Sequence, residues 1–180
     1  MKKILVLIDV QNDFITGSLP NPEAQKAVPN IVKKIEGFDG DAIFYTKDTH
    51  FPDYLETKEG QNLPFEHCIS TTWGWEIEDT VAHAIVTRAN DVHVQKVIKN
   101  TFGSTLLPKM IQLFANGEGV EIELVGFCTD ICVVSNALIL KANFFESADI
   151  TVDSSCCAGT SPERHEAALE VMRSCQINVK

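Results

Sequence analysis

The sequence has no long apolar run and few positive charges. Only 15 lysines and arginines stand against 25 aspartates and glutamates, which gives a formal net charge of -10. This acidic balance argues against a nucleic-acid-binding face or an anionic membrane surface as the partner. Because no apolar segment is long enough to span a bilayer, we expect no membrane-spanning helix.

Several familiar motifs are also missing. No Cys-X-X-Cys pair occurs, which argues against a structural zinc site built of cysteines alone. The Gly-X-Gly-X-X-Gly fingerprint is absent, which argues against the commonest type of dinucleotide-binding site. With no repeat or linker in 180 residues, we predict one domain, residues 1–180, with a sizeable core.

The first apolar run is too short for an export signal. Residues 4–8 are apolar, and Asp9 then interrupts the run with no small-residue cleavage site behind it. We therefore expect the six cysteines to be reduced rather than paired, and the protein to be cytoplasmic.

Apolar strand-like runs alternate with helical segments along the chain. Strands are predicted at residues 3–8, 42–46, 92–97, 120–125, 150–153 and 177–179, and helices at 22–36, 76–84, 105–115, 131–146 and 161–174. Such alternation is typical of a parallel sheet with helices on both faces. We predict an α/β fold: three α/β/α layers around a mainly parallel, Rossmann-like sheet of six strands.

One thiol lies where a strand passes into a helix. The apolar run 120–125 leads into a Gly/Thr/Asp turn, and Cys132 sits near the start of the helical segment that follows. Unpaired N–H groups and the helix dipole favour a thiolate there, and they can also hold an oxyanion. Cys132 is thus a candidate nucleophile. A buried structural cysteine fits this segment alone equally well.

Two other predicted strands end in chargeable residues. Asp9 follows the run 4–8, and Lys96 lies near the end of the run 92–97, ahead of Asn-Thr-Phe-Gly-Ser-Thr. Open α/β sheets place their sites at the carboxyl ends of the strands. We therefore expect Asp9, Lys96 and Cys132 to meet at one edge of the sheet.

The middle of the chain contains possible metal ligands. Asp48 and His50 form an Asp-X-His pair at the end of a strand, and His67 lies in the long loop that follows. Oxygen and nitrogen donors of this kind bind zinc, manganese or iron. A solvated acidic loop with two incidental histidines is the alternative interpretation.

Together these segments resemble the isochorismatase-like cysteine hydrolases. Asp9 in Asp-Val-Gln-Asn-Asp-Phe, Lys96 and Cys132 in Gly-Phe-Cys-Thr-Asp-Ile-Cys-Val follow the order of that family's catalytic triad. The resemblance implies that family's fold and a thiol hydrolase, with Asp9 as base and then acid. It also implies an oxyanion hole from the backbone N–H groups of Cys128 and Cys132, and a cis peptide bond at Phe127–Cys128.

The metal motif resembles the nicotinamidase branch of that family. The likeness implies a divalent metal, zinc first and manganese or iron as alternatives, that binds a pyridine nitrogen and places the carboxamide over the thiol. That branch often uses a second loop histidine, and none lies between His50 and His67 here. Glu59 is the predicted replacement, because a carboxylate is an equally good ligand, and Glu56 is the alternative. The predicted reaction is hydrolysis of nicotinamide to nicotinate and ammonia.

The substrate pocket is predicted less specifically. Phe14, Leu63 and Gln11 are expected to line it, with Phe65 a weaker candidate and Asn136 a possible orienting residue. Another small carbamoyl or ureido amide is the alternative substrate, and a non-catalytic binding protein of the same fold is the rival class. We expect a homo-oligomer with a small amide as its partner.

Two departures from the family pattern bear on the substrate. Thr71-Thr72 stands where the family often has Gly-Thr, and Asn100-Thr101 where Ser-Ala is common. Both are expected near the pocket, where they would affect the choice of substrate more than the chemistry.

Overall fold

The computed structural model describes residues 1–180 and contains a six-stranded sheet. The strands lie in the order β3-β2-β1-β4-β5-β6, and every neighbouring pair is parallel. Their bounds are β1 Lys2–Ile8, β2 Ala42–Asp48, β3 His93–Lys99, β4 Val120–Phe127, β5 Ala148–Ala158 and β6 Asn178–Val179. The predicted parallel α/β sheet is confirmed.

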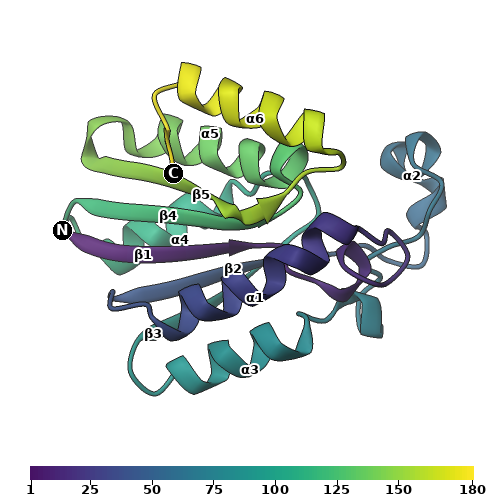
Figure 1. Ribbon diagram of the computed structural model, residues 1–180, viewed down its shortest axis with the longest axis horizontal. Helices are drawn as coiled ribbons and strands as arrows, with labels where there is room; N and C mark the ends of the chain where they lie inside the picture. The colour runs from purple at the N-terminus through teal and green to yellow at the C-terminus, as the bar shows by residue number, and fades with distance from the viewer.

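Helices cover both faces of this sheet (Figure 1). They are α1 Pro22–Glu36, α2 Lys58–Asn62, α3 Asp79–Arg88, α4 Leu106–Ala115, α5 Val134–Phe144 and α6 Pro162–Ser174. The helices α1 and α3 pack on one face, and α4, α5 and α6 pack on the other. None of them is long and apolar enough to cross a membrane.

The central strand β1 supplies both cores. Ile4, Val6 and Ile8 belong to the core under α4, α5 and α6, while Leu5 and Leu7 belong to the core under α1 and α3. Successive side chains of a strand point to opposite faces, so a strand covered on both sides must be apolar throughout. The unbroken run 4–8 therefore marks the middle of the sheet.

Helix starts follow the expected capping chemistry. The Asn21 side chain accepts hydrogen bonds from the N–H groups of Glu23 and Ala24, with Pro22 in the first turn of α1. The Ser161 hydroxyl accepts from Arg164 N–H at the start of α6. The predicted first helix matches α1 at both ends.

Several element boundaries differ from the sequence prediction, among them those of α3, β5 and β3. Helix α3 begins at Asp79 because the Glu78 carboxylate caps it, accepting from two N–H groups of its first turn. Strand β5 extends to Ala158, and β3 extends to Lys99. The last difference decides which lysine reaches the site.

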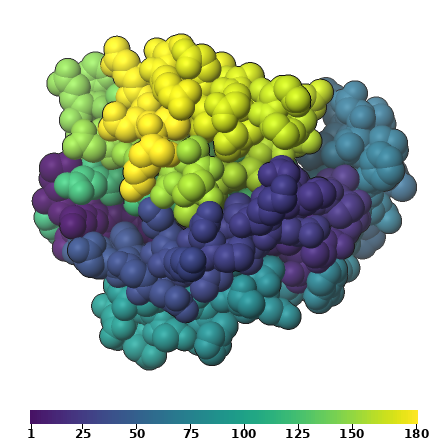
Figure 2. Space-filling view, viewed as in Figure 1, coloured from purple at the N-terminus to yellow at the C-terminus, as the bar shows by residue number.

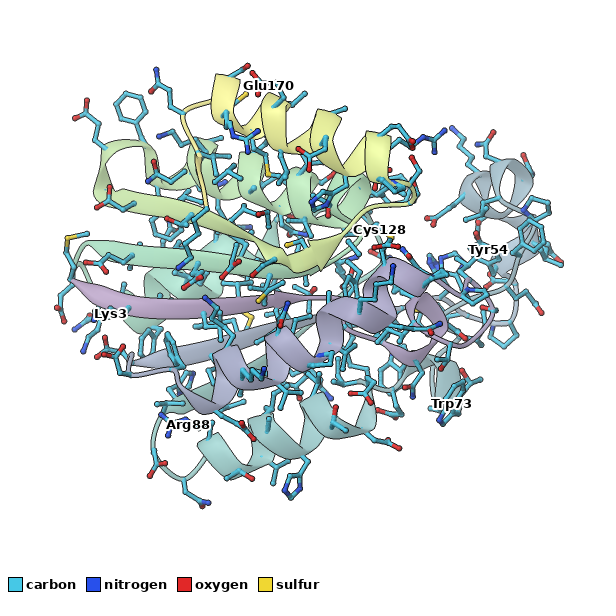
Figure 3. The ribbon with its side chains drawn as sticks, viewed as in Figure 1. Lys3, Tyr54, Trp73, Arg88, Cys128 and Glu170 are labelled. Atoms are coloured by element: carbon cyan, nitrogen blue, oxygen red, sulfur yellow. The ribbon has the colours of Figure 1, made fainter.

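The segment 49–75 stands beyond the carboxyl ends of the strands. In Figure 3, the labelled Cys128, which follows β4, and Tyr54, which lies in this segment, are at the same end of the sheet. The space-filling view shows the part around α2 forming that end of the molecule (Figure 2). Strand ends and this segment therefore enclose one region.

Candidate active site

Asp9 is held at the end of β1 by its neighbour on β2. It is completely buried, and its backbone lies in the left-handed region, with a φ of 48°. The Asp9 N–H donates to Thr46 Oγ1 at 3.1 Å, and the same hydroxyl donates to Asp9 Oδ1 at 2.6 Å. Burial raises the pKa of the Asp9 carboxyl, although the charge of Lys99 opposes that rise.

The lysine of the site is Lys99, and the prediction of Lys96 is wrong. Lys99 Nζ lies 2.6 Å from Asp9 Oδ2 and 3.6 Å from Cys132 Sγ. Lys96 is exposed, and its Nζ lies 6.0 Å from the centre of the Trp75 ring on the α3 side of the sheet. Residues three apart on a strand point to opposite faces, so only one of these lysines can face the thiol.

The Lys99 ammonium keeps its charge. It is 4% exposed and also lies 3.3 Å from Asp48 Oδ1. Burial alone would lower its pKa, but the charges of Asp9, Cys132 and Asp48 raise it above the ordinary lysine value. The site therefore contains a fixed positive charge between two carboxylates and a thiol.

Cys132 lies in the π-helix Thr129–Val133 that leads into α5, and it is 5% exposed. Burial and the neighbouring Asp9 charge raise the pKa of its thiol well above the usual value, while Lys99 lowers it. The sequence predicted a thiolate favoured by the helix start. The structure gives the opposite direction, because desolvation and a carboxylate outweigh the ammonium. The resting thiol holds its proton and needs a base.

The turn before Cys132 has the predicted backbone. The peptide bond between Phe127 and Cys128 is cis, as the resemblance implied. Gly126 has a φ of 122°, and a Cβ there would collide with the carbonyl oxygen of Ile8. Only glycine lets β4 approach β1 this closely just ahead of the nucleophile turn.

Four predicted metal ligands converge beside this group. Asp48, His50, Glu59 and His67 each offer a donor atom, and these atoms lie within 4.8 Å of one another. His50 Nε2 is 3.1 Å from Asp48 Oδ2 and 3.6 Å from Glu59 Oε1. His67 Nε2 is 3.6 Å and 3.8 Å from the same two oxygens.

The donor set fits a divalent metal ion. A tetrahedral ion with bonds of about 2.1 Å holds its ligands roughly 3.4 Å apart, close to the separations seen here. The His67 Nδ1–H donates to the Phe65 carbonyl at 2.9 Å, which leaves Nε2 as the electron-pair donor facing the other ligands. Glu59 belongs to this cluster, whereas Glu56, the predicted alternative, is exposed outside it.

Backbone contacts hold the later residues of the segment 49–75 beside His50, close to the end of β2. His50 pairs with Ile69 in an isolated bridge, and His50 N–H donates to Cys68 O at 2.9 Å. The completely buried Tyr54 packs edge-on against the rings of His50 and His67. These contacts bring ligands from distant positions of the segment to one point.

Thiol and metal donors open into one cavity of about 490 Å³, a usual size for a small-molecule site. Its walls include Phe14 and Leu63, as predicted, together with Phe65 and Phe102. Cys132, Asp48, Glu59 and His67 also line it. A small molecule in this cavity would contact the sulfur and the metal donors together.

Gln11 does not line the cavity, and this prediction is wrong. Its completely buried side chain donates to the carbonyls of Asp48 and Trp75 and accepts from Asp48 N–H at 2.8 Å. Gln11 therefore fixes the backbone of a metal ligand. Thr71 and Thr72, expected near the pocket, are exposed and also lie outside its wall.

The sequence reading missed Thr46 and Lys99. A sequence signal for Lys99 was present, because it directly precedes Asn-Thr-Phe-Gly-Ser-Thr; its pairing with Asp48 is seen only in the structure. Thr46 lies in a largely apolar strand, and nothing in its position in the sequence indicates a hydrogen bond to Asp9.

The chain is similar to known proteins over nearly its whole length. The nicotinamidase of Schizosaccharomyces pombe is 23% identical over 205 residues, covering 97% of this chain and 91% of its own. The crystal structure of nicotinamidase/pyrazinamidase PncA from Bacillus subtilis has a TM-score of 0.83 and 26% identity, covering 99% of both chains. The pyrazinamidase of Pyrococcus horikoshii, solved in complex with zinc, has a TM-score of 0.75 and 26% identity, covering 100% of this chain and 99% of its own.

The model of the isochorismatase domain matches residues 3–179, nearly the whole chain. With a buried thiol, carboxylate and ammonium at the carboxyl edge of a parallel sheet, the chain belongs to the isochorismatase family.

Proposed function

We propose that this protein is an amidohydrolase that cleaves nicotinamide to nicotinate and ammonia with Cys132 as nucleophile. One observation carries the proposal: the cavity that exposes Cys132 is also lined by Asp48, Glu59 and His67 of the metal donor set. The relatives named nicotinamidase, similar over nearly their full lengths, support the same reaction.

The first step is transfer of the Cys132 proton to Asp9. Asp9 Oδ2 is buried and lies 2.6 Å from the Lys99 ammonium, and a carboxylate oxygen has a second electron pair that can take this proton. The raised pKa of Asp9 makes it a stronger base than an exposed carboxylate. The thiolate then attacks the carboxamide carbon and forms the C–S bond.

The tetrahedral oxyanion would accept hydrogen bonds from the backbone N–H groups of Cys128 and Cys132, at the start of the helical turn. When the C–N bond breaks, Asp9 returns its proton to the nitrogen and ammonia leaves. Asp9 then takes a proton from water, whose oxygen attacks the thioester. Release of the carboxylic acid restores the thiol.

Lys99 keeps its proton through this cycle. Its ammonium lies 2.6 Å from Asp9 Oδ2 and 3.6 Å from the sulfur, so it stabilises negative charge on whichever atom carries it. It therefore makes both the resting carboxylate and the attacking thiolate accessible at neutral pH.

Asp48, His50, Glu59 and His67 would hold the metal ion, which we propose to be zinc, with manganese or iron as alternatives. A bound ion supplies a Lewis acid for the pyridine nitrogen of the substrate. The chain's own contribution is orientation: Phe14 and Leu63 wall the cavity and exclude water around the ring.

We also propose that the protein forms a homo-oligomer. Large apolar side chains remain exposed in the single chain, among them Phe51 at 55%, Phe65 at 57% and Trp73 at 58%. Light scattering coupled to gel filtration tests this, and a mass of one chain would contradict it.

The test of function is ammonia release from nicotinamide by zinc-loaded protein, with Cys132→Ala as the control. We expect release by the wild type and a loss of at least about 1,000-fold in the variant. If loaded wild type releases no ammonia, nicotinamide is not the substrate, and small carbamoyl and ureido amides are assayed with the same control. An unaltered rate in Cys132→Ala would exclude the thiol mechanism.

A further inference from the structure

Asn136 is a polar residue in the apolar interior beneath α5. It is 0% exposed, yet its amide is fully bonded. Oδ1 accepts from Ser104 N–H at 2.9 Å, while Nδ2 donates to the carbonyls of Cys132 at 2.8 Å and Phe102 at 3.2 Å.

These partners belong to two different segments of the site. Cys132 lies one turn earlier in the same helical stretch, and Phe102 and Ser104 lie in the loop that directly follows Lys99. A single side chain thus joins the turn that carries the thiol to the segment that carries the ammonium.

A second observation shows that the two segments are closely fitted. A Cβ on Gly103 would lie 2.5 Å from Ile139 Cδ1 and 3.2 Å from Ser135 Cβ, both on α5. Glycine at this position therefore lets the loop lie directly against the helix, within reach of Asn136.

Packing alone does not call for asparagine here. Asn is mostly an exposed residue, and burying its amide is unfavourable unless every group is hydrogen-bonded. An aliphatic side chain would fill the same space without that requirement. A buried polar group with all its bonds made instead fixes one relative placement of the segments it joins.

We propose that Asn136 is a positioning residue that sets the distance between Cys132 Sγ and Lys99 Nζ. It touches neither substrate nor reacting atoms and acts through the two backbone segments. The catalytic part of this proposal rests on the thiol hydrolase function proposed above. A displacement of about 1 Å at a reacting group can cost roughly 100-fold in rate, so the expected effect is large for a residue outside the pocket.

Two variants of nearly equal shape test the proposal. In Asn136→Thr, the hydroxyl can still donate to the Cys132 carbonyl four residues earlier, but both bonds to the loop are lost, whereas Asn136→Val loses all three bonds. The first readout is the rate of Cys132 alkylation by iodoacetamide near neutral pH, followed by mass spectrometry, which needs no substrate. The second is kcat and KM for ammonia release.

We expect Asn136→Val to slow alkylation and to lower kcat about 10-fold or more, with KM within about two-fold. Asn136→Thr should show a similar loss in both, because the bond it keeps lies within its own helical stretch and does not join the two segments. Ser104→Ala is the control: it removes the hydroxyl that accepts from Leu107 N–H but keeps the backbone N–H that Asn136 binds. Its alkylation rate should equal that of the wild type.

A folded Asn136→Val protein with wild-type alkylation and kcat would overturn the proposal. If that variant does not fold, Asn136→Asp replaces it, because it keeps the acceptor for Ser104 and loses both donors. Absence of nicotinamide turnover in the wild type would refute the proposed substrate alone, since alkylation still measures the placement of the thiol.

Discussion

The reactive groups and the metal donors share a cavity but rest on different kinds of structure. Asp9 directly follows the central strand β1, Lys99 ends the edge strand β3, and Cys132 lies in the π-helix that leads into α5; they are 0%, 4% and 5% exposed. Of the metal donors, Asp48 ends a strand, while Glu59 comes from α2 in the segment outside the sheet, with its side chain 23% exposed. The hydrolytic groups are thus held at the ends of strands and in a helical turn, whereas three of the four metal donors, His50, Glu59 and His67, come from the segment 49–75.

The largest effect is expected when the positive charge is removed from the reactive groups. Lys99→Met should lower the rate of ammonia release by about 100- to 1,000-fold, because the thiolate and the Asp9 carboxylate lose their neutralising partner. Lys96→Met is the matched control, since Lys96 is exposed on the other face; it should stay within about two-fold. Circular dichroism establishes that both are folded, and equal losses in the two variants would refute the assignment of Lys99.

Removing one carboxylate tests the metal donor set. Glu59→Gln should weaken zinc binding by roughly 10- to 100-fold and leave Cys132 alkylation near the wild-type rate, because a carboxylate ligand is lost outside the triad. Equilibrium dialysis with metal analysis measures this. Glu56→Gln, a change of the same type at an exposed position, should bind zinc like the wild type. Equal zinc affinity in both would remove Glu59 from the ligand set.

A smaller effect is expected from a change in the apolar wall of the cavity, which the reactive groups and the metal donors share. Leu63→Ala should raise KM about 10-fold with little change in kcat, because an apolar contact with the ring is lost in ground state and transition state alike. Leu113→Ala, at a position 81% exposed on α4, should change neither. Steady-state kinetics on nicotinamide measure both constants, and an unchanged KM would show that the substrate ring does not contact Leu63.

The smallest effect concerns an ion pair that belongs neither to the reactive groups nor to the metal donors. Partial burial favours the neutral acid at Asp153, but hydrogen bonds from Lys34 and Ser155 lower the pKa of this carboxyl below its usual value. The pair of Lys34 and Asp153, 2.6 Å apart, therefore contributes stability above about pH 4 and loses it as the pH falls through the lowered pKa.

Lys34→Met should cost about 1 kcal/mol at neutral pH, a modest value because the lysine is partly solvated. The difference should shrink as acid protonates Asp153, and kcat should stay unchanged. Urea unfolding at pH 7 and in acid measures it. Lys26→Met, which breaks an exposed pair with Glu23, should have almost no effect; a Lys34 penalty that grows in acid would contradict the account.

The sequence predicted best where one local signal decides the outcome. Helix α1 follows from Asn21 and Pro22, and the position of Asp9 follows from the apolar strand before it. It predicted less where the end of a strand decides which face a residue takes. Ending β3 at residue 97 selected Lys96, whereas two more residues of strand bring Lys99 to the thiol.

Side-chain direction outside regular elements was the other limit. Gln11 follows the strand turn and could face either the cavity or the backbone of β2; only the tertiary structure places it on Asp48. The raised pKa of Cys132 was missed for the same reason, since the helix start is visible in sequence and the depth of burial is not.

The Thr46 hydroxyl makes the two oxygens of Asp9 unequal. A free carboxylate is symmetric, and a proton arriving at it has two equivalent places to bind. Because Thr46 donates to Oδ1 while its own oxygen accepts from the Asp9 N–H, that half of the carboxylate is occupied, and Oδ2 alone faces Lys99. A proton that arrives from sulfur or water, and one that leaves for the amide nitrogen, therefore passes through Oδ2. One small side chain on a neighbouring strand thus gives every proton transfer in the cycle the same route.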